Sequence, residues 1–131
     1  GPSLLKTLDG ISMEEAKVKP LGERHSIWEL VDHLAFWNEA VAKSVGQERM
    51  PDPSNVVSWP EVGDTESEWK ASVDKLRQRV HQLLDELADW KNEDLEKEVP
   101  GANYNFKQML HGVVHHNLYH AGQIAILRKK I

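Results

Sequence analysis

The chain of 131 residues contains no cysteine. This absence excludes disulfide bonds, thiolate metal ligands and a cysteine nucleophile. No apolar run approaches the roughly 20 residues that a membrane-spanning helix needs, so we expect no membrane partner. Strand signals, internal repeats and a signal peptide are lacking as well. We therefore expect a cytoplasmic protein with one domain, residues 1–131, built from helices.

Positive charge is also scarce. The 16 Lys and Arg residues are outnumbered by 21 Asp and Glu residues, which gives a formal net charge of −5. This balance disfavours nucleic acid as a partner. Charges of both signs are mixed along the chain, which is typical of a solvated surface. The apolar residues make up 40% of the sequence, enough for one modest core.

Three long amphipathic segments dominate what is present. Apolar residues recur in each at the spacing of a helix that buries one face. A good N-cap residue begins each segment and a Glu or Gln follows three residues later, the pattern of a capping box. The N-cap residues are Ser26, Thr65 and Asn105. The segments span about residues 26–47, 65–88 and 105–130.

Shorter segments connect the long helices. Two short helices are expected before Pro20, at about residues 3–8 and 13–17. Residues 50–63 form a long connection with three prolines, and Trp59 is expected to pack it against the core. Residues 91–103 form a second connection. The pattern predicts an all-α bundle with three long helices and a short fourth.

Histidines are concentrated in the last long segment. Residues spaced by four lie on one face of a helix, and the segment holds two such pairs, His111/His115 and His116/His120. A helical wheel places His116 and His120 toward the bundle and the other pair toward solvent. An inward histidine usually only forms a hydrogen bond in the core. That ordinary role is the alternative to metal binding.

The first long helix offers a third ligand. His33 lies at the flank of its apolar stripe, although a half-exposed surface histidine would occupy the same position. Three neutral imidazoles suit zinc, nickel, copper or iron(II) rather than magnesium or calcium. Three ligands with a free fourth position are typical of catalytic zinc sites. We do not expect the following residues to be ligands, because they lie away from the stripe or outside the helix: His25, Glu29, Asp32, Glu39 and His81.

Two segments resemble a known family. His25-Ser-Ile-Trp-Glu-Leu-Val-Asp-His33-Leu-Ala-Phe-Trp resembles the second helix of the DinB/YfiT-like superfamily, and residues 110–128 resemble its last helix. The resemblance implies an all-α, DinB-like four-helix bundle, often dimeric, with a divalent metal held by three histidines. In this chain those ligands fall on His33, His116 and His120. Trp59-Pro-Glu-Val and Trp69 are similar to the connecting region of that family.

The resemblance also implies a function. It suggests a metal-dependent hydrolase, or a transferase that uses a low-molecular-weight thiol, acting on a small-molecule substrate with zinc or nickel. The residues identify no separate catalytic group. The chain departs from similar sequences in two ways, since Asn117 stands where Asp is common and the first helix is shortened. The alternative is a bundle that binds a metal or a small ligand without catalysis.

Overall fold

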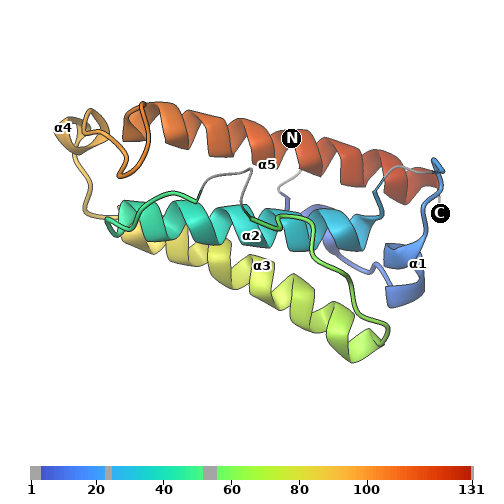
Figure 1. Ribbon diagram of the computed structural model, residues 1–131. Helices are drawn as coiled ribbons and strands as arrows, with labels where there is room; N and C mark the ends of the chain where they lie inside the picture. Colours follow the sequence, from blue (N-terminus) through green and yellow to red (C-terminus); the bar gives the residue numbers. More distant parts are fainter. Residues whose placement is uncertain (1–3, 23–24, 52–55, 131) are drawn as a thin grey trace.

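The structure, a computed structural model, describes residues 4–22, 25–51 and 56–130 (Figure 1). Three long helices form the bundle, and α2 lies between α3 and α5. The helical elements are η1 (Lys6–Leu8), α1 (Met13–Lys17), α2 (Ile27–Val45), α3 (Glu66–Leu87), α4 (Asn92–Leu95) and α5 (Phe106–Lys130). These described ranges contain no β-strand. The predicted all-α bundle is therefore confirmed.

The N-cap residues fix where the helices begin. The Ser26 hydroxyl accepts from the backbone N–H of Glu29, whose carboxylate accepts from the backbone N–H of Ser26. This complete capping box satisfies two N–H groups that the helix leaves without partners. The box predicted at Thr65 is only half formed. Thr65 accepts from the backbone N–H of Glu68, but the Glu68 carboxylate accepts from the Thr65 hydroxyl and from Asp64 N–H instead.

The apolar side chains form two buried groups along the bundle. One group packs the first half of α2 against Trp69 and Leu76 of α3 and Ile124 of α5. The other packs the end of α2 against Leu83 of α3 and Phe106 of α5. Between the two groups, the inward positions of α2 and α5 carry histidine and asparagine. The bundle therefore contains a polar layer in the middle of its length.

Short segments close the ends of the bundle. η1 and α1 lie within the two short helical segments expected before Pro20. Residue 3, the first of that expectation, lies outside the described residues. The Trp69 indole N–H donates to the Ile11 carbonyl at 2.8 Å, and Arg128 donates to the Thr7 carbonyl at 3.1 Å. These two bonds attach the N-terminal segment, which contains η1 and α1, to α3 and α5. At the other end, the predicted connection 91–103 contains the single turn of α4.

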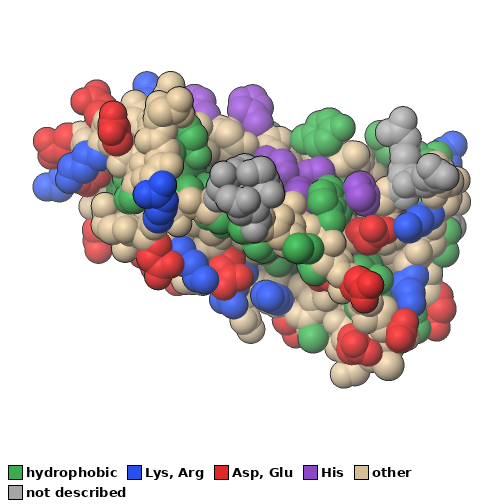
Figure 2. All heavy atoms as spheres, in the orientation of Figure 1, with side chains coloured by type: hydrophobic (Ala, Val, Ile, Leu, Met, Phe, Trp, Pro, Cys, Tyr) green, Lys and Arg blue, Asp and Glu red, His purple; other side chains and the backbone are tan. Residues whose placement is uncertain are grey.

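The surface view shows how charge is distributed. In Figure 2 the histidine side chains gather along α5 and over the middle of the molecule, where α5 lies beside α2. Acidic and basic side chains lie at both ends and along the lower edge of this view. None of the helices within the described ranges is long and apolar enough to span a bilayer.

Candidate metal centre

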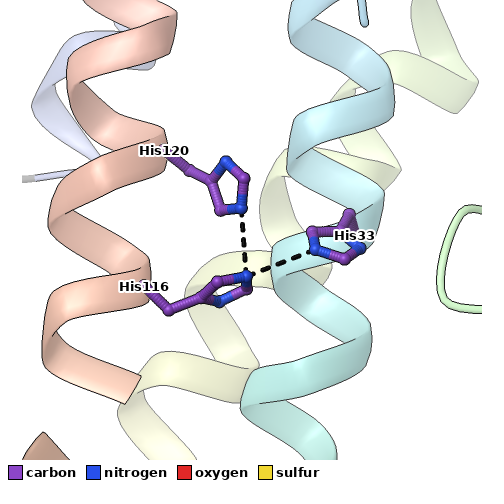
Figure 3. Close-up of side chains that lie close together, drawn as sticks. All are labelled: His33, His116 and His120. Atoms are coloured by element: carbon purple, nitrogen blue, oxygen red, sulfur yellow. Dashed lines mark hydrogen bonds between the residues drawn. The ribbon is translucent and has the colours of Figure 1, made fainter. Parts of the chain in front are cut away.

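Three histidine rings meet in the polar layer. His33 projects from α2, and His116 and His120 project from successive turns of α5 (Figure 3). Nε2 of His116 lies 3.3 Å from Nε2 of His33 and 3.0 Å from Nε2 of His120. Nitrogens bound tetrahedrally to one zinc ion at 2.0–2.1 Å would lie about 3.4 Å apart. The ring nitrogens are therefore spaced like ligands of a single ion.

Two of the rings are held by their other nitrogen. His33 Nδ1 lies 2.8 Å from the Ser58 carbonyl, which can only accept, so this nitrogen carries the proton. His120 Nδ1 donates in the same way to Oε1 of Gln123. In the neutral rings both Nε2 atoms then carry a lone pair. Metal-bound histidines usually hold their second nitrogen by this kind of hydrogen bond.

The three Nε2 atoms cannot all be paired in hydrogen bonds with one another. His116 Nε2 can carry one proton and donate it to one lone pair, yet the lone pairs of His33 and His120 both point at it. A cation at the centre would interact favourably with all three nitrogens. The donor set therefore fits a metal ion better than it fits a closed hydrogen-bond network.

Burial keeps these rings neutral. His33 and His120 are buried and His116 is half-buried. Burial lowers the pKa of His116 to about 4, helped by the neighbouring His120 and His33. Burial likewise lowers the pKa of His33 and of His120. Because the charged imidazolium is disfavoured, the rings offer lone pairs at neutral pH, as metal binding requires.

An aromatic stack covers His33. The Trp59 ring lies 3.8 Å from the His33 ring, centroid to centroid, and 3.6 Å from the His25 ring on its other face. The interplanar angles are 6° and 7°. The prediction that Trp59 packs its connection against the core is confirmed. The contact with a candidate ligand, and the second layer formed by His25, were not predicted.

The other histidines and carboxylates considered as metal ligands are exposed or interact with groups outside the histidine cluster. His111, His115 and His81 are exposed. Burial raises the pKa of Asp32, which faces Ser72 and Lys75 of α3 and not the histidines. Glu39 forms ion pairs with Lys43 and Arg79, and Glu29 pairs with His25 and Lys19. Within the described residues, the three histidines are the one group of possible metal ligands.

An open cavity of about 500 Å³ begins at His116 and runs between α2 and α5 toward the end of the bundle that carries α4. Its lining residues are Trp37, Val41, Met50, Tyr104, Gln108, Met109, Gly112, Val113 and His116. The sequence patterns did not predict this cavity, because a wheel shows which face a residue occupies but not how closely two helices approach. Of the three clustered histidines, only His116 belongs to the cavity lining.

Comparison with known proteins agrees with this architecture. The family model described as the DinB superfamily matches residues 2–124. No curated protein and no solved structure matches the chain. The family match covers nearly the whole sequence, including α2, the part of α5 up to residue 124 and the three histidines. The chain belongs to the DinB superfamily.

Proposed function

We propose that the chain binds one divalent transition metal, zinc or nickel, through His33, His116 and His120. The observation that carries this proposal is the convergence of three Nε2 atoms from two helices while the Nδ1–H groups of His33 and His120 are held by fixed acceptors. Neutral nitrogen ligands of this kind suit zinc and nickel. Three ligands also leave a tetrahedral position free for water or substrate.

We further propose that the site acts in metal-dependent hydrolysis or in transfer of a low-molecular-weight thiol. A metal ion in this place would lower the pKa of a water or a thiol and would polarise a substrate carbonyl. The protein's part is positioning. Ser58 and Gln123 orient two rings, Trp59 shields one face of His33, and the cavity admits substrate on the side of His116. The two reactions differ in whether activity requires an added thiol.

Metal content tests the binding proposal. We expect wild-type protein, incubated with zinc or nickel and freed of excess metal, to retain about one ion per chain, as a single set of three ligands implies. His120→Ala should retain almost none, whereas His115→Ala should match the wild type because His115 is exposed. Helix content measured by circular dichroism should stay unchanged in both variants. A wild-type protein that keeps neither metal would refute the proposal.

We also propose that two copies pair through the outer side of α5. Val114, Leu118, Tyr119 and Ile126 are 55%, 62%, 65% and 56% exposed there. Residues 108–127 include no Asp, Glu, Lys or Arg. A two-fold axis brings identical surfaces together, and this surface, which also carries the exposed His111 and His115, has no Asp, Glu, Lys or Arg to repel its own copy. This surface supports the homodimer that the family resemblance implies.

A further inference from the structure

The cavity beside His116 has apolar walls. Val41, Met109 and Val113 belong to the buried core and also line the cavity, and Trp37 and Met50 extend this lining. Gln108, Tyr104 and His116 are its polar lining residues. Among the lining residues in the described part of the chain there is no Asp, Glu, Lys or Arg. A charged group bound here would lose water without gaining an opposite charge.

The cavity also borders the histidine cluster, because the two share one residue. His116 belongs to both, since its Nε2 lies within 3.3 Å of the other two Nε2 atoms while its ring lines the cavity wall. Val113 and Met109 line the same cavity, so a molecule with a polar group beside His116 could place its remainder along them. Small-molecule sites commonly combine such apolar walls with a few polar groups at one end.

We propose that the substrate of this site carries a neutral apolar tail, alkyl or aryl, which fills the cavity while its reacting group lies beside His116. This inference rests on the proposed metal-dependent function and names the class of substrate. The tail contributes affinity through burial of apolar surface, and the absence of lining charges selects against tails that carry carboxylate or phosphate.

Two glycines of α5 provide a matched pair for the test. Gly112 lines the cavity, and a Cβ built on it meets no atom within 4 Å. Leucine at this position therefore has room to occupy the cavity without displacing the backbone. Gly122 is also helical, exposed and open around its Cβ, but it does not line the cavity. Both replacements raise helix propensity, so neither is expected to impair folding.

The probes are acetohydroxamate and octanohydroxamate, which share a metal-binding head and differ in tail length. Titration calorimetry on zinc-loaded protein should show octanohydroxamate binding about tenfold tighter or more, since each fully buried methylene contributes about fourfold. Gly112→Leu should weaken the binding of octanohydroxamate until its Kd is close to that of acetohydroxamate. The Kd of acetohydroxamate itself should stay unchanged. Gly122→Leu should behave like the wild type with both probes.

The possible results separate the two proposals. If acetohydroxamate binds but octanohydroxamate binds no tighter, the apolar-tail inference is overturned and the metal site stands. The same conclusion follows if Gly112→Leu keeps the full advantage of the longer tail. If the wild type takes up no zinc and binds neither probe, the proposed function fails and the inference fails with it.

Discussion

Asn38 of α2 and Asn117 of α5 exchange side-chain hydrogen bonds across the bundle. Asn38 Nδ2 donates to Asn117 Oδ1 at 3.0 Å, and Asn117 Nδ2 donates to Asn38 Oδ1 at 3.2 Å. Asn38 is fully buried and also donates to the Leu34 carbonyl at 2.8 Å. Asn117 adjoins His116, and Asn38 lies about one and a half turns beyond His33. We infer that the pair fixes the register of the two helices that carry the histidines, as buried polar residues do in coiled coils.

We expect Asn117→Leu to lower the free energy of unfolding by about 1–3 kcal/mol, because the buried Asn38 amide loses a partner. The double variant with Asn38→Leu should lose less than the sum of the two single changes, with a coupling of about 0.5–3 kcal/mol. Urea unfolding of the four proteins measures this cycle. Additive single effects would show that the two amides do not act as a pair.

Gln123 orients His120, so its replacement should weaken metal binding without removing a ligand. We expect Gln123→Ala to raise the Kd for zinc about 10–100-fold, the usual effect of losing a partner of a metal-bound histidine. Gln123→Glu keeps an acceptor for the Nδ1–H of His120 and should restore tight binding. Competition with a chromophoric chelator measures both values. Equal Kd values for Gln123→Ala and wild type would contradict this role.

Local patterns predicted most of the fold. Serine at position 26 and asparagine at 105 begin helices as expected, because a capping box involves only residues three apart in sequence. The half-formed box at Thr65 escaped prediction, since the preceding Asp64 N–H competes for the same carboxylate. The turn of α4 also escaped it, because a single turn is too short to show helical periodicity.

The candidate site could be predicted only in part. Spacing by four and the apolar face of α5 singled out His116 and His120, and the flank of the α2 stripe suggested His33. That these rings converge on one point depends on how α2 and α5 pack. The Ser58 carbonyl and the Trp59 ring come from a connection 25 residues beyond His33 or more, and no local periodicity indicates where such a connection runs.

The histidine cluster should make the metal-free protein sensitive to mild acid. The fold lowers the pKa of His116 from 6.5 to about 4. Between these two pH values, His116 is protonated in the unfolded chain but neutral in the folded chain. The stability that neutral His116 contributes above pH 6.5 is thus lost as the pH falls toward 4, by at most about 1.4 kcal/mol per pH unit. His33 and His120 shift in the same direction.

Urea unfolding in the presence of a chelator, at pH 7 and pH 5, measures this loss. His116→Gln should reduce the difference between the two pH values, because glutamine takes up no proton. His115→Gln should leave the difference unchanged, since His115 is exposed. A wild-type protein equally stable at both pH values would show that the folded histidines titrate normally.

Dimer formation through the outer side of α5 can be tested by substitution. If two copies pair there, Leu118→Glu brings like charges together near the two-fold axis and should dissociate the dimer. Leu84→Glu is the matched control, because Leu84 is 59% exposed on α3, close to the 62% of Leu118. Sedimentation velocity should give twice the chain mass of 15.0 kDa for the wild type and Leu84→Glu, and the single chain mass for Leu118→Glu. Zinc content should be equal in all three proteins, because Leu118 is exposed and does not belong to the cluster of His33, His116 and His120. A dimer that survives Leu118→Glu would place the interface on another surface.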